Sequence, residues 1–521
     1  RELWTRSLEG DLSILLISGE PGIGKSKLAR ELSTWVEAGG GHCLRGECFA
    51  EIGMPYGPFV QIMEDALGDK DLAALEIPDP VLADLASIAP SINVKITGAG
   101  ANPQLDPLSE QYRLYESVLN FLNIYKEDKP LLVVLEDLHW ADSSSLGLLR
   151  HLARRTRRDS ICFLATYREV EIEQETTLFD LLADLNRQRL SKRMKISRLD
   201  RQETRAMLEM ILGQHVSDTL LDSIFYETEG NPFFIEEVCK SLVEDGKLFQ
   251  IDGRWSRVDS EELEIPQSVR LVVQNRLKKV SPDTKEILQQ AAILGQVFDF
   301  EILEEASAID PGRLRSQLRA AERAQLIQIE PAPKGERYEF AHALIPSTLA
   351  RELDASILSE LHGKAAGAIR SRRPDDFEAL AYHYSQAGDR QLARRYFVRA
   401  ANRAREIYAH EDALQFYTKA LALSDDDLAD RYDLLSARAK TYDLLASREQ
   451  QLSDAELLLE ISKELQDPQR ECDALIQLAD VYLVTDHPRA VHPAEKAVEL
   501  ARSMGDLYRE GQALRQLGDQ A

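Results

Sequence analysis

Short, continuously apolar runs alternate with amphipathic stretches over the first 200 residues of the chain. The runs that predict strands lie at residues 13–18, 131–135, 161–166 and, more weakly, 193–197. Apolar strands separated by helices are typical of a parallel sheet that is covered on both faces. We therefore expect an α/β domain over residues 1–200, with an insert at 71–110 whose many Pro, Ala, Ser and Gly residues predict part helix and part loop.

The middle of the chain predicts two smaller units. Residues 201–264 have the pattern of short helices closed by a polar, turn-rich stretch, and we interpret them as a helical lid or linker domain. Residues 265–375 predict three helices followed by a β-hairpin, which is the pattern of a winged helix. The helices are expected at 267–279, 282–293 and 312–323, and the hairpin strands near 326–329 and 338–340.

Residues 376–521 predict amphipathic helices only, and an internal repeat is visible among them. Identical residues recur 39 positions apart at Ala455 and Ala494, Glu460 and Glu499, Asp467 and Asp506, Arg470 and Arg509, Ala474 and Ala513, and Gln477 and Gln516. A smaller unit spaces Ala393, Phe397 and Ala400 like Ala413, Tyr417 and Ala420. Small residues let paired helices approach and the aromatic ring fills the gap, so we expect a tetratricopeptide-like solenoid rather than a generic helical bundle.

Charge and cysteine content narrow the class of protein. The 521 residues include 63 Lys and Arg against 88 Asp and Glu, a net charge of −25. Such a field repels polyphosphates, so we expect no direct nucleic-acid binding by this segment. The five scattered cysteines predict reduced thiols in a cytoplasmic protein, and no apolar run approaches the ~18–20 residues that span a bilayer. The chain begins with Arg rather than Met and stops within the repeat, so we interpret it as a fragment.

The clearest chemical signal is the octapeptide GEPGIGKS, which follows the first apolar run and precedes a helical stretch. It matches G-x-x-x-x-G-K-[ST], in which glycines let backbone N–H groups point at phosphate oxygens and the next helix adds the positive end of its dipole. Lys25 is expected to contact the β- and γ-phosphates, and the Ser26 hydroxyl to ligate Mg²⁺. The predicted nucleotide-contacting residues here are Gly19, Glu20, Pro21, Gly22, Ile23, Gly24, Lys25, Ser26 and Lys27.

Two acids, Glu136 and Asp137, end the apolar run LLVVL, and a P-loop needs such partners at the end of a neighbouring strand. Carboxylates at the carboxyl end of a buried strand face the ligand crevice of an open α/β sheet. One acid is expected to hold Mg²⁺ and the other to orient or activate the attacking water. Which acid does which stays open, whereas Asp142, farther along, fits a helix cap better.

Arg168 ends the next apolar run, in ATYRE, and should reach the same crevice. It is either a sensor of the terminal phosphate or a partner in a surface salt bridge. The basic stretch RHLARRTRR at 150–158 invites a nucleic-acid interpretation, but it lacks interleaved aromatic residues. Since the helix dipole stabilises cations at a helix C-terminus, we interpret this stretch as a solvated helix end.

Five motifs occur in a recognisable order: GEPGIGKSKLARELS, YGPF, LEDLHWADSSSLGLLRHLARR, ATYRE and EGNPFFIEEV. In this combination the chain resembles the STAND-type signal-transduction P-loop ATPases found with bacterial large LuxR-type regulators and class III adenylate cyclases. The ATPase core of that branch resembles Orc1-type AAA domains. The likeness extends through FAHALI into the repeat and so covers essentially the whole chain. It implies a P-loop ATPase domain at 1–200, a lid at 201–264, a winged helix at 265–375 and repeats at 376–521, with ATP or ADP and Mg²⁺ as ligands.

The resemblance also assigns roles to matching positions. Glu136 and Asp137 would be the acidic pair and Arg168 the first sensor. Pro232, in the GNP motif, would pack near the adenine and set the angle between the ATPase domain and the winged helix. His342, in FAHAL, would touch the nucleotide phosphates in the closed state, although a core histidine fits that position equally well. The family often has two Asp after the strand, and the Glu-Asp pair here makes slow hydrolysis of ATP to ADP plausible.

The implied function is a nucleotide-driven switch. The repeats would sense a protein or small-molecule inducer and couple the ATP/ADP state to an effector domain outside this segment, either a transcription regulator or an adenylate cyclase, with homo-oligomerisation on activation. Two alternatives stay open: an AAA-type ATPase in DNA-associated remodelling, which the acidic charge disfavours, and a nucleotide-bound scaffold without turnover. A small-molecule P-loop kinase is disfavoured because nothing resembles a lid or acceptor site for it.

Overall fold

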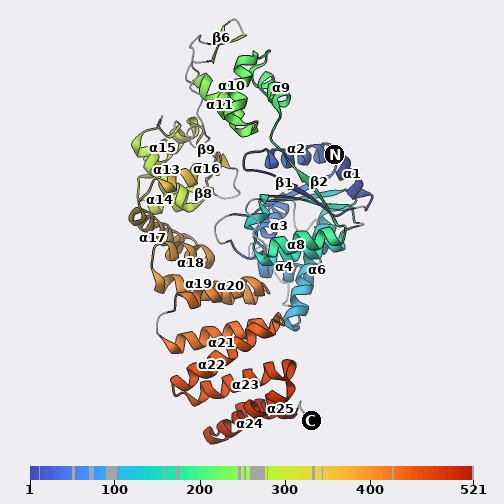
Figure 1. Cartoon of the computed structure of the whole chain (residues 1–521), viewed down its shortest axis with the longest axis vertical. Helices are drawn as coiled ribbons and strands as arrows, with labels where there is room; N and C mark the ends of the chain where they lie inside the picture. The colour runs from blue at the N-terminus through green and yellow to red at the C-terminus, as the bar shows by residue number, and fades with distance from the viewer. Residues whose placement is uncertain are drawn as a thin grey trace.

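The computed structural model describes residues 1–10, 12–49, 53–69, 75–89, 102–157, 159–169, 176–244, 248–251, 254–257, 276–278, 280–330, 335–342, 344–424 and 427–518. The chain leads from an α/β domain through two smaller units into a stack of helices (Figure 1). The first helices of that stack share a hydrophobic core with the α/β domain. The chain therefore turns back on its own beginning.

Five parallel strands form the sheet of the α/β domain, in the order β2-β3-β4-β1-β5. They are β1 (Ile14–Ser18), β2 (His42–Glu47), β3 (Leu131–Glu136), β4 (Ile161–Tyr167) and β5 (Ser191–Lys195). The three central strands are buried along their whole length, which is why they appear in the sequence as continuous apolar runs. β5 lies two residues earlier than predicted, and β2 was not predicted, because both are edge strands with polar and charged residues.

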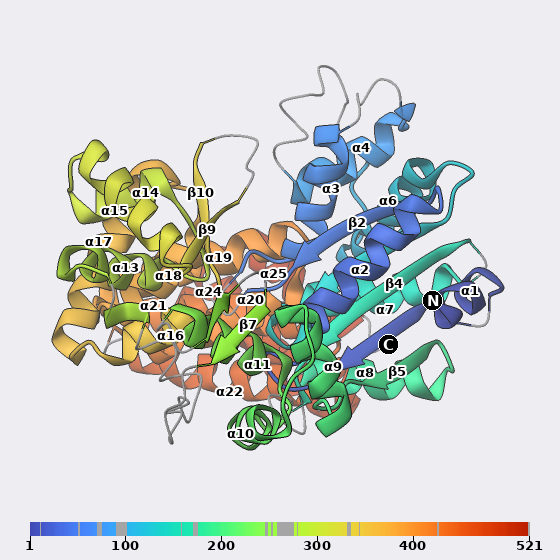
Figure 2. The same ribbon diagram turned by 90° about the horizontal axis from the view of Figure 1, so that it is seen from above.

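Helices cover both faces of this sheet (Figure 2). α1 (Glu2–Leu8) and α2 (Lys25–Ala38) pack on one face against even-numbered residues of β3 and odd-numbered residues of β1. The other face is covered by α3 (Gly57–Asp69), α4 (Asp79–Ile88), α6 (Pro107–Lys126), α7 (Ser143–Arg155) and α8 (Thr177–Arg187). α4 belongs to the predicted insert, whose residues 90–101 lie outside the described ones. The basic stretch at 150–158 does end a helix, α7, as predicted.

Two smaller units follow. The first is a helical unit around its own core, made of α9 (Arg201–Leu212), α10 (Asp218–Thr228) and α11 (Pro232–Glu244). A hairpin of β6 (Leu248–Ile251) and β7 (Arg254–Arg257) comes next, partly where polar turns were predicted. The second unit contains α13 (Pro282–Leu294), α14 (Phe300–Ser307), α15 (Pro311–Arg323), α16 (Leu344–Arg351) and the antiparallel strands β8 (Val297–Asp299), β9 (Ile327–Glu330) and β10 (Arg337–Phe340).

Most of the elements that were predicted for the second unit are present in the structure. The helices expected at 282–293 and 312–323 are present, and β9 pairs with β10 as the predicted hairpin. α14 and β8 were not predicted, and the helix expected at 267–279 lies largely outside the described residues. The winged-helix identity of this unit stays a prediction.

The rest of the chain is helical, as predicted. Its helices are α17 (Ala355–Arg372), α18 (Phe377–Gln386), α19 (Arg390–Glu406), α20 (His410–Ala422), α21 (Leu428–Leu444), α22 (Arg448–Glu464), α23 (Pro468–Thr485), α24 (His487–Met504) and α25 (Leu507–Gly518). Successive helices pack side by side along one line (Figure 1). Among the described residues, none of the helices combines the length and apolar character needed to cross a bilayer.

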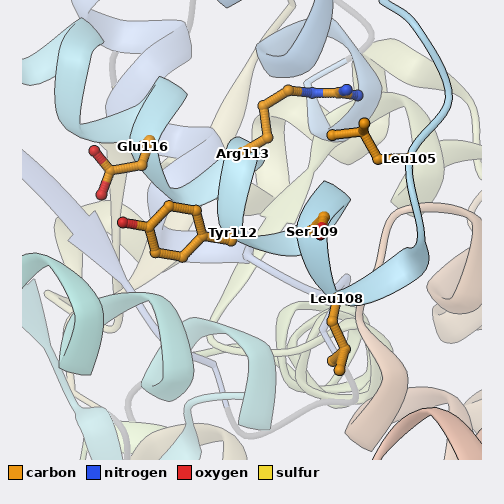
Figure 3. Close-up of a pocket in the computed structure, with 6 residues that line it drawn as sticks. All are labelled: Leu105, Leu108, Ser109, Tyr112, Arg113 and Glu116. Atoms are coloured by element: carbon orange, nitrogen blue, oxygen red, sulfur yellow. The ribbon is translucent and has the colours of Figure 1, made fainter.

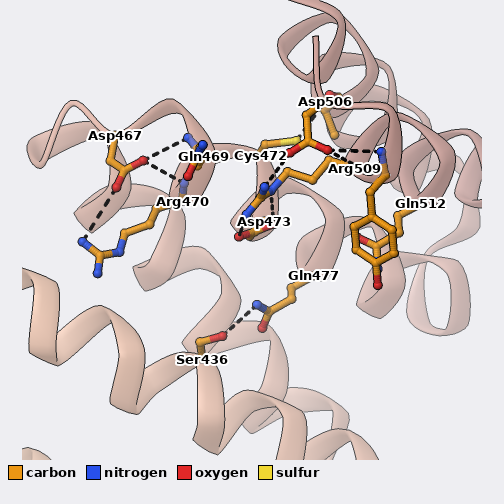
Figure 4. A network of polar contacts seen from close by, with 12 residues as sticks. Ser436, Asp467, Gln469, Arg470, Cys472, Asp473, Gln477, Asp506, Arg509 and Gln512 are labelled. Atoms are coloured by element: carbon orange, nitrogen blue, oxygen red, sulfur yellow. Dashed lines mark hydrogen bonds and ion pairs between the residues drawn. The ribbon is translucent and has the colours of Figure 1, made fainter. Parts of the chain in front are cut away.

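The 39-residue repeat has a structural basis in polar contacts (Figure 4). Asp467 and Asp506 occupy equivalent positions and accept hydrogen bonds from backbone N–H groups of the first turns of α23 and α25. The arginine three residues after each of them reaches back by one repeat, Arg470 to Asp433 and Arg509 to Asp473. The sequence identities 39 residues apart thus include capping and bridging groups as well as core alanines.

The contact between β2 and α3 predicts the effect of one glycine substitution. A Cβ atom at Gly46 would lie 2.3 Å from the carbonyl oxygen of Pro58, a backbone atom that cannot rotate away. We expect Gly46→Ala to lower the free energy of unfolding by about 2 kcal/mol, as overpacking does. Gly367→Ala, in α17 with no heavy atom within 4 Å, should instead stabilise by about 0.5–1 kcal/mol. Urea unfolding of both variants checks this, and equal effects would contradict it.

Candidate functional site

The P-loop, residues 19–26, joins β1 to α2 and curls around one amine. Gly22 and Gly24 have φ of +75° and +102°, in the left-handed region that glycine alone adopts without strain, and Gly24 is the N-cap of α2. Lys25 begins the helix, and its Nζ donates hydrogen bonds of 3.1 Å to the carbonyl oxygens of Gly19 and Glu20. Its side chain is buried, whereas Ser26 is half-buried and Lys27 exposed. The loop thus presents a helix N-terminus and a buried cation at one place.

The sheet order corrects one expectation about the two acids. β3, which ends with Glu136, does not neighbour β1, because β4 lies between them. All three strands are parallel, so their carboxyl ends still meet at the same edge of the sheet. β4 places Thr166 and Arg168 between the P-loop and the acids, as the next apolar run was expected to do.

Glu136 is a buried acid that faces α2. It alternates with Leu132 and Val134, which pack in the core beneath that helix. It forms an ion pair with Arg45 of β2, which the sequence did not predict, and the oxygen that contacts the guanidinium is Oε1. A buried carboxylate at this edge of the sheet fits a hard divalent cation, which would have to compete with Arg45 for it.

A third acid, Glu47, was missed by the sequence analysis. It ends β2 in register with Glu136. Burial, and next the charge of Glu136, raises the pKa of Glu47 to about 8. At neutral pH the Glu47 carboxyl is therefore mostly protonated in this arrangement, and Arg45 pairs with Glu136. Its position on an unpredicted edge strand hid it from sequence reasoning.

Asp137 lies in the turn directly after β3 and adopts a left-handed φ of +55°. Its backbone N–H donates a 3.0 Å hydrogen bond to the Thr166 hydroxyl of β4, which fixes the turn to the neighbouring strand. Its Oδ1 lies 3.8 Å from Nδ1 of His139. Burial first, then the charges of Arg168 and Lys25, lowers the pKa of His139 to about 3. The P-loop lysine, Arg168 and the turn with Asp137 are thus close enough to interact electrostatically.

Arg168 lies between this turn and the unit that contains β10. Its guanidinium carbon is 4.7 Å from the ring centre of Trp140, a cation–π contact. Burial, followed by the charge of Arg168, lowers the pKa of His342 to about 4, so the cation also faces the segment after β10. The structure therefore brings two predicted residues, Arg168 and His342, into one neighbourhood from parts of the chain 174 positions apart.

The GNP motif at the start of α11 contacts the P-loop directly. Asn231 Nδ2 donates a 3.2 Å hydrogen bond to the Pro21 carbonyl, and the Phe233 N–H donates one of 3.3 Å to the Gly22 carbonyl. A Cβ atom at Gly22 would lie 3.0 Å from Cβ of Phe233. The contacts thus come from the two neighbours of Pro232, the residue that the resemblance singled out. The GNPFF sequence was the signal that could have found them.

Phe233 also connects the P-loop to His342. The two rings stack with centres 3.8 Å apart and planes 19° from parallel, and Phe233 packs against the core of the α13–α16 unit. His342 Nδ1 accepts a 3.1 Å hydrogen bond from the Leu344 N–H. His342 is therefore one side chain away from the backbone of Gly22 rather than in direct contact with it.

Arg198 makes a further link between the P-loop and the segment before the GNP motif. Its Nε donates a 2.9 Å hydrogen bond to Glu20, and its guanidinium forms an ion pair with Glu229. Gly230, which follows, has a φ of +77°, and a Cβ atom there would lie 1.9 Å from the Leu199 carbonyl oxygen. Only glycine fits this approach, so the position of the GNP motif relative to the P-loop is sterically defined.

One hollow on the surface lies away from this site. It has a volume of about 530 Å³ and is lined by residues in and just before α6: Leu105, Leu108, Ser109, Tyr112, Arg113 and Glu116 (Figure 3). These side chains come from one helix and its N-terminal flank, and none belongs to the P-loop or to the acid-bearing turn. The candidate site is therefore defined by the residues at the carboxyl edge of the sheet.

Comparison with known proteins gives three kinds of match. Residues 1–164 match the family described as AAA ATPase domain. An uncharacterized protein of Rhizobium meliloti (strain 1021) is 26% identical over 478 residues, which are 84% of this chain and 43% of that protein. The chain thus spans less than half the length of this curated relative.

Two solved structures resemble the chain weakly. A STAND protein with a tetratricopeptide repeat sensor from Pyrococcus horikoshii is 13% identical, with a TM-score of 0.46 over 100% of this chain and 79% of that one. The Drosophila ORC bound to AT-rich DNA and Cdc6 is 12% identical, with a TM-score of 0.22 over 67% of this chain and 88% of that one. Residues 1–164 thus match an AAA ATPase domain, and with the helical repeat that follows they fit the STAND type that the sequence motifs resemble.

Proposed function

We propose that the chain is a nucleotide-controlled switch, in which ATP or ADP at the P-loop decides how the later units sit on the ATPase domain. The observation that carries this proposal is the contact of the P-loop backbone with Asn231 and Phe233, since Phe233 in turn stacks on His342. A ligand at the P-loop cannot change the loop without changing these contacts. Ligands shift such an equilibrium only by binding the two arrangements differently, and this contact supplies the difference.

The residues divide the work of binding and hydrolysis as follows. Lys25 would exchange the carbonyl oxygens of Gly19 and Glu20 for phosphate oxygens, and Ser26 with Glu136 would hold Mg²⁺. The cation would neutralise charge on the phosphates and orient them. Glu136 is assigned the metal because it faces α2, which leaves Asp137, in the turn, to orient the attacking water. Arg168 faces the terminal phosphate. We expect slow hydrolysis because Glu136 stands where the family often has Asp, and its longer side chain shifts the position of the metal.

The coupling is to an effector that lies outside this segment, either a transcription regulator or an adenylate cyclase, with the inducer bound by the repeats. The helical stack supports this assignment because solenoids offer extended binding surfaces. A nucleotide-bound scaffold would share the contacts but not turn over ATP. A turnover assay with and without an activating partner separates the two.

The first test is Lys25→Ala. Removing the buried ammonium leaves the phosphates without their main positive contact, and we expect ATP and ADP affinity to fall at least 100-fold, about 3 kcal/mol. Equilibrium titration with a fluorescent ATP analogue measures it. Arg30→Ala, which removes an exposed cation farther along α2, is the matched control and should bind nearly as tightly as the wild type. Unchanged affinity in Lys25→Ala would remove the basis of the proposal.

The second test concerns the ion pair of Arg45 and Glu136. Mg²⁺ has to displace the guanidinium from this acid, so Arg45→Met should raise the affinity for the metal by about tenfold, as loss of a competing charge does. The same variant should be less stable without metal, because a buried carboxylate loses its partner. Thermal melting with and without MgCl₂ measures both effects. Arg193→Met, exposed on β5, is the control, and an equal response in both variants would argue against Glu136 as a ligand.

The third test uses the pKa of His342. In the observed arrangement the pKa is about 4, whereas a solvated histidine titrates near 6.5, so the contact binds the neutral ring. The contact is then fully favoured above pH 6.5 and is lost as the pH falls toward 4. We expect the equilibrium constant for closure to be about tenfold lower at pH 5.5 than at pH 8. Fluorescence energy transfer between α2 and α15 measures it, and His342→Gln should remove the dependence.

A further inference from the structure

The repeat touches the ATPase domain at the corner between α19 and α20. The carbonyl oxygen of Tyr408 accepts a 2.7 Å hydrogen bond from Gln111 Nε2 of α6 and a longer one, 3.5 Å, from the Tyr56 hydroxyl. Gln415 Nε2 donates a 3.3 Å hydrogen bond to the Ser143 hydroxyl at the start of α7. We call this set, with Asp412, the docking contact. In Figure 1, α20 lies beside the α/β domain, while α21 to α25 extend away from it.

Asp412 is the central residue of the docking contact. Its carboxylate accepts 3.0 Å hydrogen bonds from the N–H groups of Ser143 and Ser144 and a further one from the Ser144 hydroxyl. It is 4% exposed. The first N–H groups of a helix have no partner within that helix, and an anion there is stabilised by the helix dipole. A residue of the repeat thus accepts hydrogen bonds from the otherwise unpartnered N–H groups in the first turn of a helix in the ATPase domain.

The N-cap of α7, Asp142, accepts a hydrogen bond from a further N–H group of this first turn. It accepts hydrogen bonds from the N–H and the hydroxyl of Ser145 and, at 3.1 Å, from the N–H of Tyr56. The first turn of α7 is therefore capped twice, once by its own residue and once by Asp412. An internal cap would have served the stability of α7 alone, so the second cap connects α7 to the repeat.

The start of α7 is close in sequence to the acid-bearing turn. Asp137 and Asp142 are five positions apart, and the short η2 helix (Leu138–Trp140) fills the segment between them. Asp137 is fixed by the Thr166 hydroxyl at one end, and Trp140 lies against Arg168. A segment this short and this constrained transmits a shift of the first turn of α7 to Asp137 and Arg168.

We propose that Asp412 is a positioning residue: the repeat, through this side chain, holds the first turn of α7 and with it the turn that presents Asp137 to the nucleotide. Departure of the repeat would release α7 and loosen the nucleotide site. The proposal rests on the proposed nucleotide site at the carboxyl edge of the sheet, and it names which contact regulates that site.

The electrostatics of the docking contact make it reversible. Burial, and next the charge of Asp142, raises the pKa of Asp412 to about 7, and burial raises the pKa of Asp142 as well. Among the described groups that face this pair, Cys48, Tyr56 and Tyr115 of the ATPase domain have their pKa raised by it in addition to burial, and Lys419 of α20 is the cation that it acts on. Two buried carboxyl groups at one helix end disfavour each other, so the helix N–H groups only partly offset the cost of docking.

The test compares Asp412→Ala with a matched cap variant, Asp389→Ala, in the 521-residue chain. Asp389 caps α19 by accepting a 2.9 Å hydrogen bond from the Leu392 N–H, and the structure gives it no hydrogen bond to the ATPase domain among the described residues. Both variants remove one helix-capping carboxylate of the repeat, but Asp389→Ala uncaps α19 itself, whereas Asp412→Ala uncaps α7 and removes the docking contact. Asp412→Asn, which keeps one acceptor oxygen, should lie between the wild type and Asp412→Ala.

Two readouts decide the outcome. Hydrogen exchange should become at least tenfold faster at residues 137–145 in Asp412→Ala and stay unchanged there in Asp389→Ala. Dissociation of a fluorescent ADP analogue, followed by stopped flow, should be about tenfold faster in Asp412→Ala only. If exchange rises but ADP release does not, Asp412 is a structural contact and the positioning role is wrong.

A further outcome separates this proposal from the proposed function. If the wild type binds no ADP analogue at all, the nucleotide switch fails, and exchange at residues 137–141 alone then decides whether Asp412 holds the acid-bearing turn. If both aspartate variants alter exchange and ADP release equally, the effect is general destabilisation of the repeat, and the proposal is wrong.

Discussion

Two weak hydrogen bonds, from Asn231 and Phe233 to carbonyl groups of the P-loop, join the nucleotide site directly to the helical unit that follows the ATPase domain. Neutral hydrogen bonds of this kind contribute about 0.5–1.5 kcal/mol each. Phosphate binding at a P-loop involves several charge-assisted contacts, which are roughly twice as strong. Phosphate binding is therefore strong enough to replace these two hydrogen bonds. A P-loop held by stronger contacts with α11 would respond less to the nucleotide.

Acidic residues outnumber basic ones in this chain by 88 to 63, yet several cations lie at the site. Lys25 is held by loop carbonyls, Arg45 by Glu136, and Arg198 by Glu20 and Glu229. Arg168 lies over Trp140. Each of these cations is held by hydrogen bonds, ion pairs or a cation–π contact within the protein. Phosphate groups can compete for the cations, and Mg²⁺ can compete for the carboxylates that bind them.

The sequence predicted the centre of the sheet better than its edges. A strand that is buried on both faces, such as β3, must be apolar throughout, so the run LLVVL could be recognised as a strand. The P-loop could be recognised because its positive φ angles require glycine at fixed positions. β2 carries polar residues because it is an edge strand, and Glu47 was missed with it. The order of the strands in the sheet could not be predicted from the sequence either. A parallel strand is followed by a helix whichever strand it pairs with, so the pattern along the chain is the same for every order. Asp412 could not have been found, since nothing local distinguishes an aspartate that caps its own helix from one that caps another.

The rungs between Arg470 and Asp433 and between Arg509 and Asp473 have a mechanical meaning. α20 is held on the ATPase domain by the docking contact, whereas α21 to α25 extend away from that domain. A force on α25 reaches α20 only as far as the stack of helices is stiff, and these arginine–aspartate ion pairs stiffen it. Since dissolved salt screens such ion pairs, the helical stack is stiffer, and transmits force better, in dilute solution than in concentrated salt.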